Sequence, residues 1–251
     1  MVMSLFVYWL FFPIAQGNEI KVDQAFIEQH LKAVALLESG RYSSALILVD
    51  DYKGTPLWHI INAFTLSDAK QYDAALQELE KAREWLDENI VEIKQENESS
   101  IYSAYTKIAY LHYNALIADI SFRGKEWKKC VVHAKNTLRI GLVPGNIYRL
   151  SGCYDYLGET DNALKYMTQA YKLTKETSPL DQNNYANHIN IAYNVSALHG
   201  RKGSLLKSLE YLKIVLENDG ERYLPKIEKD KDFDKIRKAP AFVALIKKFK
   251  K

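Results

Sequence analysis

Few residues in this sequence have the types and the spacing that chemistry requires. Cys130 and His133 lie three positions apart on one predicted helix face, where they could supply two ligands to a zinc ion. A structural zinc site needs four ligands, and no companion residues follow at a useful spacing. We therefore expect no metal here and interpret the pair as residues that fill the interior between helices.

Three aspartates near the C-terminus imitate the opening of a calcium-binding loop. They are Asp230, Asp232 and Asp234. Such a loop needs glycine at its sixth position and a bidentate glutamate at its twelfth, whereas Lys235 and Ala241 occupy those positions. We interpret the aspartates as the solvated start of a helix.

Motifs that carry a nucleophile or bind phosphates or dinucleotides are missing. The sequence contains no GxSxG, no P-loop, no dinucleotide fingerprint and no HExxH. The 34 Lys and Arg nearly balance the 31 Asp and Glu, and the net charge of +3 is spread along the chain. Nucleic-acid binding usually needs a concentrated basic face. We predict a protein that is not an enzyme, has no cofactor and binds no nucleic acid.

The elements that must position these residues are helices. Apolar side chains recur at helical spacing, for example at Leu79, Ala82 and Leu86, and no stretch alternates as a strand would. Thr55-Pro56 places an N-cap hydroxyl before a proline at the first helical position, where the missing N–H costs nothing. The sequence therefore predicts an all-α fold.

The first 17 residues differ from the rest of the chain. Residues 1–17 carry no charged side chain, and an apolar run precedes Pro13. The run is shorter than the roughly twenty apolar residues that span a bilayer. Ala15 and Gly17 place small side chains at the −3 and −1 positions of a cleavage site. We predict a signal peptide cleaved after Gly17, a periplasmic or secreted protein, and membrane contact through this segment alone.

The signal segment departs from the usual pattern in one respect. No Lys or Arg precedes its apolar run. An uncleaved N-terminal anchor, or a wrongly assigned start on a cytoplasmic protein, therefore stays open. Neither cysteine lies near the cleavage point, which excludes a lipoprotein anchor.

A short motif recurs five times along the chain. Each copy has a turn residue, a bulky residue two positions later and a small residue three positions beyond that. The turn residues are Gly40, Lys70, Lys125, Gly158 and Gly203, and the small residues are Ala45, Ala75, Cys130, Ala163 and Ser208. We interpret the turn residue as the end of one helix and the bulky residue as a side chain that packs into the turn. The small residue then allows the next helix to cross the first one closely.

This pattern resembles the tetratricopeptide repeat family, in which pairs of antiparallel helices stack along an axis. The resemblance covers roughly residues 25–218. It implies an α-solenoid of about five helix pairs, which we assign to a domain of residues 18–218. Residues 72–97 and 100–123 look longer than usual repeat helices, and we expect them to form a projecting hairpin.

The C-terminal segment, residues 219–251, carries a second resemblance. Asp219-Gly220 is expected to end a helix, and the later order of Phe233, Ile236-Arg237 and Pro240 is similar to the end-of-group segment that closes many bacterial tetratricopeptide arrays. We therefore expect a bacterial protein in which this segment caps the apolar face of the last helix pair.

The resemblance implies a binding or scaffolding function. In this family the first helix of each pair lines a concave groove that holds a peptide or protein partner. Aligning the units predicts the following groove residues: Ile60, Phe64, Phe122, Tyr148, Asp155, Tyr156, Tyr193 and Arg201. The alternative is that these side chains pack between helices, because the repeat pattern also places aromatic residues there.

Other functions stay open. The chain could be a subunit or an assembly factor of an envelope complex. It could also be an enzyme that uses groove carboxylates, since the same alignment places Asp68, Asp119 and Asp155 there.

The resemblance also bears on the two cysteines. It places Cys130 on the second helix of one unit and Cys153 on the first helix of the next, and such helices pack together. An oxidising compartment would permit a disulfide, provided that the Cα atoms lie within roughly 7 Å. The alternative is a pair of buried, inert thiols.

Overall fold

The computed structural model describes residues 24–93, 101–177 and 182–250. Within these ranges the regular structure is helical throughout, which confirms the predicted all-α fold. The predicted signal peptide and the tip of the predicted long hairpin lie outside the described residues. Among the described helices, none has the length and apolarity that crossing a bilayer requires.

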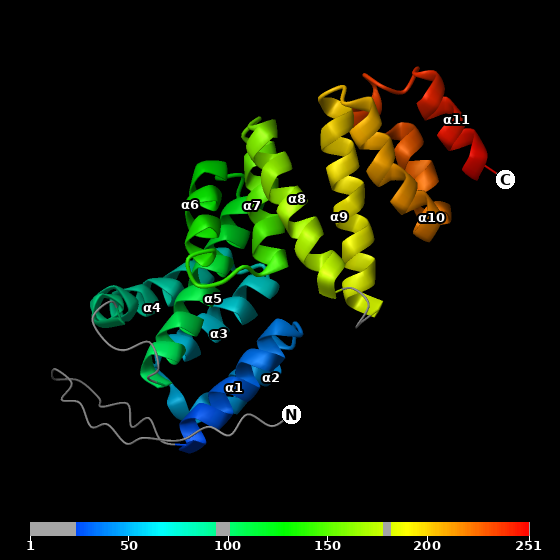
Figure 1. Ribbon diagram of the computed structural model, residues 1–251. Coiled ribbons are helices and arrows are strands. Elements are labelled where there is room, and N and C mark those ends of the chain that lie inside the picture. The colour runs from blue at the N-terminus through cyan, green and yellow to red at the C-terminus, as the bar shows by residue number, and fades with distance from the viewer. Residues whose placement is uncertain (1–23, 94–100, 178–181, 251) are drawn as a thin grey trace.

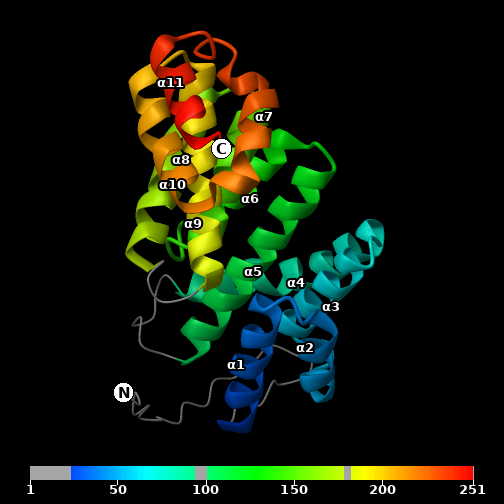
Figure 2. The ribbon, with the colours of Figure 1, turned by 90° about the vertical axis from the view of Figure 1, so that its right-hand side faces the viewer.

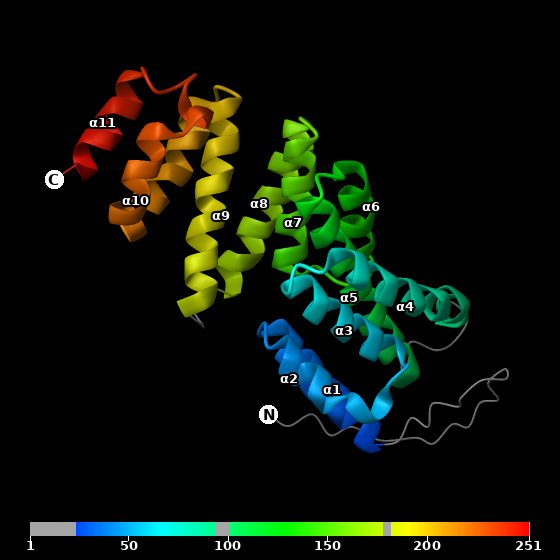
Figure 3. The same ribbon diagram turned by 180° about the vertical axis from the view of Figure 1, so that it is seen from behind.

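The helices follow one another along the molecule in chain order, each packed against its neighbours in sequence. Figures 1 and 3 show α1 and α2 at one end and α11 at the other. The bounds are α1 Gln24–Glu38, α2 Tyr42–Leu48, η1 Asp50–Tyr52, α3 Pro56–Asp68, α4 Tyr72–Ile93, α5 Ile101–Arg123, α6 Trp127–Thr137, α7 Pro144–Tyr156, α8 Thr160–Thr177, α9 Gln182–Arg201, α10 Leu205–Lys229, η3 Lys231–Phe233 and α11 Pro240–Phe249.

The recurring motif has the same local structure in all five copies. Its turn residues have left-handed φ values of 76°, 62°, 60°, 77° and 77°. A helix begins at the bulky residue two positions later, namely Tyr42, Tyr72, Trp127, Thr160 and Leu205. The small residues that follow are each 0% exposed. The motif therefore marks the same turn and the same buried position in every pair.

Small residues on the preceding helix face these buried positions. In two pairs the contact is a hydrogen bond: Ser151 Oγ donates to the Ala163 carbonyl at 2.7 Å, and Ser196 Oγ donates to the Ser208 carbonyl at 2.8 Å. A side chain can reach the backbone of the neighbouring helix only where the two helices approach closely. The crossing point of each pair is thus set by small residues twelve positions apart.

The helices α4 and α5 are longer than α3 and α6, which flank them in the chain. Leu79 and Leu86 of α4 are buried against α3 and α5, while the far end of α4 points away from the other helices (Figures 1 and 3). Figure 2 shows α5 running between the group of α1 to α4 and the group of α7 to α11. This long helix therefore connects the two halves of the molecule.

The C-terminal segment packs onto the last helix pair. Asp219 leaves helical geometry inside α10, which produces a kink where the helix end was expected. Beyond it, Phe233, Ile236 and Phe242 are buried in the same cluster as α9 and α10. Burying a side chain of this size stabilises a fold by about 1.5–3 kcal/mol.

Candidate functional site: the face formed by α3, α5, α7 and α9

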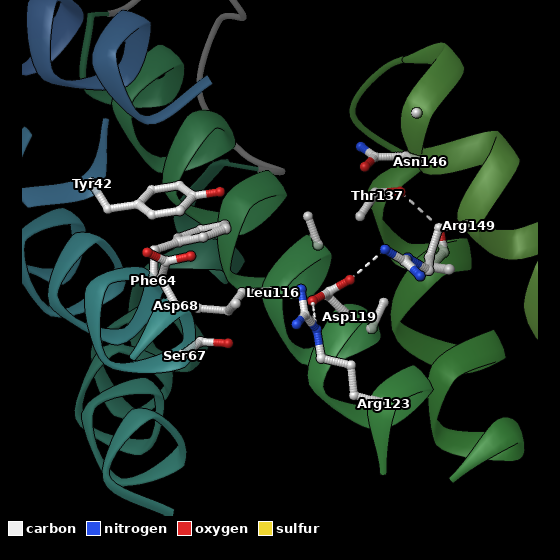
Figure 4. A pocket seen from close by; sticks show the side chains of 14 residues that line it. Tyr42, Phe64, Ser67, Asp68, Leu116, Asp119, Arg123, Thr137, Asn146 and Arg149 are labelled. Atoms are coloured by element: carbon white, nitrogen blue, oxygen red, sulfur yellow. Dashed lines mark hydrogen bonds and ion pairs between the residues drawn. The ribbon is translucent and has the colours of Figure 1, made fainter. Parts of the chain in front are cut away.

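Two adjacent cavities lie along the first helices of the pairs. The first cavity, of about 340 Å³, lies between α3, α5 and α7, with Tyr42 of α2 at its edge (Figure 4). The second cavity, of about 200 Å³, lies between α5, α7 and α9, with Asp232 of η3 at its edge. Arg149 lines both cavities, so they adjoin each other, and we call their combined lining the groove face.

Six of the eight predicted groove residues line these cavities. Phe64 lies in the first cavity. The second brings together Phe122, Tyr148, Asp155, Tyr156 and Arg201. The five predicted residues of the second cavity come from three helices that are distant in sequence. They lie together only because the helix pairs pack side by side.

The second cavity has an aromatic rim. The Trp127 and Tyr156 rings stack with centroids 4.5 Å apart, and Phe122 meets Tyr156 edge-on at 5.3 Å. Tyr148 is held separately, because its hydroxyl accepts a hydrogen bond from Asn194 Nδ2 at 3.2 Å. Tyr156 is nevertheless 61% exposed. The rim thus presents a fixed aromatic surface to solvent.

An ion-pair network centred on Asp119 connects the two cavities. Arg123 Nε donates to one oxygen of Asp119 at 2.6 Å, and Arg149 binds the other oxygen. The Arg149 guanidinium also lies 4.6 Å from the centre of the Phe122 ring. The hydrogen bond to Asp119 raises the pKa of Arg123 above its ordinary value. Arg149 thereby ties α7 to α5 across the groove face.

Arg201 makes the equivalent connection further along. It donates two hydrogen bonds of 2.8 Å to the carboxylate of Asp232 and also binds Asp155. These hydrogen bonds, chiefly those to Asp232, raise the pKa of Arg201. The groove face is therefore pinned together by guanidinium–carboxylate pairs between neighbouring first helices.

Two predicted groove residues lie in the core instead. Ile60 is 0% exposed and packs with α4 and α5. Tyr193 is 1% exposed, its hydroxyl donates to Asp230, and its ring packs against Phe233. Burial and this hydrogen bond raise the pKa of Tyr193. The sequence-based assignment of Ile60 and Tyr193 to the groove is thus wrong.

The reason is a rotation about the helix axis. Ile60, Tyr148 and Tyr193 each lie three positions before the buried small residue of their helix. In α7 the cavity-lining positions include two before it and one or five after it, namely Arg149, Gly152 and Tyr156, but Tyr148 at position −3 lines the second cavity as well. One position along a helix is a rotation of about 100°, and position −3 lies at the boundary between groove and core: it is buried at Ile60 and Tyr193 but reaches the second cavity at Tyr148.

This register also identifies the residues that sequence reasoning missed. Arg149 in α7 and Asn194 in α9 occupy the same position, two residues before the small serine, and both line the second cavity. Counting from the small residue of each first helix would have found them. Asp232 carries no such signal, because it comes from the C-terminal segment.

Two of the three carboxylates considered for catalysis are engaged in ion pairs. Asp119 and Asp155 are each bound to arginine, and they lie in different cavities. Asp68 lines the first cavity on the opposite side from Arg149 (Figure 4). Asp68 and Asp119 therefore line the same cavity, but Asp119 is already bound to Arg123 and Arg149.

The residues first considered as metal ligands have other partners. Cys130 and Cys153 are placed as a disulfide, with Cα atoms 5.9 Å apart, and His133 Nδ1 lies 2.9 Å from Asn114 Oδ1. In the described ranges no cluster of three or more His, Cys, Asp or Glu could hold a metal ion.

The three C-terminal aspartates are engaged as well. Asp230 accepts a hydrogen bond from the Asp232 backbone N–H at 3.0 Å, which caps η3. Asp232 binds Arg201, and Asp234 pairs with Arg237 at 3.1 Å. Their carboxylates hold the C-terminal segment in place.

No protein-family model matches the chain, and no curated protein shows significant similarity to it. The groove face is therefore interpreted from its own residues.

Proposed function

We propose that this protein is an exported, tetratricopeptide-like solenoid of about five helix pairs. On this proposal it binds a peptide or protein segment along the groove face and performs no catalysis. The observation that carries the proposal is the shared register: the same positions of successive first helices line two adjoining cavities.

The solenoid interpretation is supported by the repetition of local structure. Five left-handed turns are each followed by a helix that buries a small residue. The C-terminal segment supports it too, because its aromatic and aliphatic side chains cover the last pair, as a cap must in a stacked array.

Partner binding is supported by the chemistry of the surface. The aromatic rim supplies contact area at low entropic cost, since its rings are already held by stacking. The arginine–aspartate pairs are satisfied within the protein, so they link neighbouring first helices without the help of a partner. Interfaces of this kind concentrate their energy in a few aromatic and arginine residues.

Export is supported by the cysteine pair. Disulfides persist in oxidising compartments and are rare in the cytosol. The placement of Cys130 and Cys153 as a bonded pair fits a protein that folds after export.

A photo-crosslinking experiment tests the proposal. A photoreactive phenylalanine analogue is placed at Tyr156 and, as a matched control, at Leu206, which is 81% exposed on a second helix. We expect a discrete crosslinked partner from position 156 and none from position 206. Tyr148→Ala/Tyr156→Ala should lower the affinity for that partner at least about tenfold, as loss of an aromatic anchor does.

Three outcomes of this experiment would contradict the proposal. Equal crosslinking from both positions would show that the groove face is not the working surface. An unchanged affinity in the double variant, with unchanged circular dichroism and thermal unfolding, would do the same. Recovery of the protein only from the cytoplasm would overturn the export part.

A further inference from the structure

The two walls of the first cavity differ in charge. On the wall formed by α5 and α7, the guanidinium groups of Arg123 and Arg149 share the single carboxylate of Asp119. The opposite wall, formed by the start of α2 and the end of α3, carries Tyr42, Phe64 and Asp68 (Figure 4). The cavity therefore has a guanidinium side and an aromatic, acidic side.

The aromatic part of the acidic wall is a stacked pair. The rings of Tyr42 and Phe64 lie nearly parallel, with centroids 5.5 Å apart and planes inclined by 23°. Phe64 and Asp68 are four residues apart on α3, so their side chains share one helix face. The carboxylate thus lies beside the ring pair at the edge of the cavity, as Figure 4 shows.

Asp68 differs from the other aspartates of the groove face. Asp119, Asp155 and Asp232 each bind an arginine, whereas Asp68 is exposed and makes no ion pair within the residues that the structure describes. It is also the last residue of α3, where the helix dipole adds negative potential.

Tyr42 is a titratable group that responds to the charge of Asp68. Burial raises the pKa of Tyr42, and the charges of Asp68 and Asp119 raise it further. Arg123 acts in the opposite direction, but its guanidinium is bound to Asp119 at 2.6 Å. Asp68 thus acts on Tyr42 without a direct ion-pair partner of its own among the described residues.

We infer that Tyr42, Phe64 and Asp68 form a subsite for a cationic side chain, a lysine or an arginine of the segment bound in the groove. A carboxylate supplies the counter-charge, and aromatic faces attract a cation through their quadrupole. The inference rests on the proposed function and deepens it. A polypeptide is the expected source of the cation, because a second cavity of about 200 Å³ adjoins the first at Arg149 and offers room for a neighbouring residue of the same segment.

The test compares charged and neutral versions of one side chain. Degenerate nonapeptide pools carry arginine at a fixed central position, or citrulline, which has the same shape without the charge. We expect the arginine pool to bind the full protein about fivefold more tightly, with a preference that falls as salt is raised. Asp68→Asn should abolish the preference. Asp73→Asn, which removes an exposed carboxylate of a second helix, should leave it intact.

A second readout detects the subsite without a peptide. Nα-acetyl-arginine N-methylamide is titrated while the ring signals of Tyr42 and Phe64 are followed by nuclear magnetic resonance. We expect shifts with this probe, much smaller shifts with the citrulline analogue, and none with Asp68→Asn. Binding of this probe as tightly as the peptide pool would point to a free small cation and overturn the assignment to a polypeptide.

The outcomes separate this inference from the proposed function. Equal binding of the arginine and citrulline pools, both weakened by Tyr148→Ala/Tyr156→Ala, would leave the groove function standing and refute the cationic subsite. An arginine preference that depends on Asp68 but not on the two tyrosines would support the subsite and refute the proposed groove. Ring shifts that persist in Asp68→Asn would also refute the subsite.

Discussion

Arg201 binds Asp232 through two hydrogen bonds of 2.8 Å, donated by Nε and Nη2 to the two carboxylate oxygens. The same guanidinium binds Asp155 of α7. One side chain of α9 therefore holds both the preceding helix pair and the C-terminal segment. This arrangement joins the groove face to the C-terminal segment, so a substitution in one should change the stability of the other.

Arg201→Lys should weaken this junction, because an ammonium group cannot reproduce the planar, two-point contact. We expect a loss of about 1 kcal/mol in the free energy of unfolding in urea. The value is modest because the side chains of Arg201 and Asp232 are 37% and 26% exposed and are screened by solvent. Lys202→Ala, which removes a pair to the exposed Asp161, is the control and should change stability by less than about 0.5 kcal/mol.

Gly200→Ala should destabilise the protein by about 2 kcal/mol. A Cβ at this position would lie 2.8 Å from the Asp232 carbonyl oxygen and 2.9 Å from Phe233 Cδ1. The backbone oxygen cannot move away without shifting η3. Gly145→Ala is the matched control, because a Cβ added there would meet nothing within 4 Å. Equal unfolding midpoints for the two variants would contradict the close packing of the cap on α9.

Lys70→Gly and Lys125→Gly should each stabilise the protein by about 0.5–1 kcal/mol. Both lysines have left-handed φ values, of 62° and 60°, which L-residues adopt at a cost and glycine adopts freely. Thermal unfolding of the single variants measures the effect. Lys172→Gly, in the interior of α8, should have the opposite sign. A loss of stability in Lys70→Gly or Lys125→Gly would mean that these turns have another geometry.

Acid should destabilise the protein through buried histidines, above all His112. Burial lowers the pKa of His112 from 6.5 to about 4, so between these values the unfolded chain binds a proton that the folded protein does not. The contribution of neutral His112 to the free energy of unfolding is therefore complete above pH 6.5. It is lost as the pH is lowered towards 4, by as much as about 3 kcal/mol. Burial also lowers the pKa of His30, His133, His188 and His199, which act with the same sign.

Urea unfolding at several pH values between about 4.5 and 7.5 measures this dependence. His112→Gln should flatten the slope by up to one proton, whatever its effect on stability at neutral pH. An unchanged slope in this variant would show that His112 is protonated as easily in the folded protein as in the unfolded chain.

Removing the disulfide should cost about 3 kcal/mol, because the bond closes a loop with a sequence separation of 23 residues. Cys130→Ala/Cys153→Ala is a conservative replacement, since alanine occupies the place of Cys130 in three other copies of the motif. Urea unfolding of this variant, and of the wild type with and without reductant, checks the value. Alkylation of two thiols in denatured, unreduced protein would contradict the bond.

Much of the fold could be predicted from the sequence because its signals are local. The turn residues, the helix starts and the buried small residues depend on spacings of two to five positions, and all five copies share these features in the structure. Apolar periodicity likewise predicted helices throughout. The groove residues were harder to predict, because each must be assigned to one side of a helix, and Ile60 and Tyr193 were assigned to the wrong side.

What the sequence determined by itself is therefore the succession of helices and the points at which paired helices cross, since both follow from backbone conformation and side-chain size within a short stretch. The tertiary structure decided which of the candidate side chains reach the groove face and which are buried, as Ile60 and Tyr193 are. A rotation of about 100° per residue separates a groove position from a core position. The pairing of Arg149 with Asp119 and of Arg201 with Asp155 and Asp232 was decided in the same way, because it depends on how helices 30 to 46 residues apart stack.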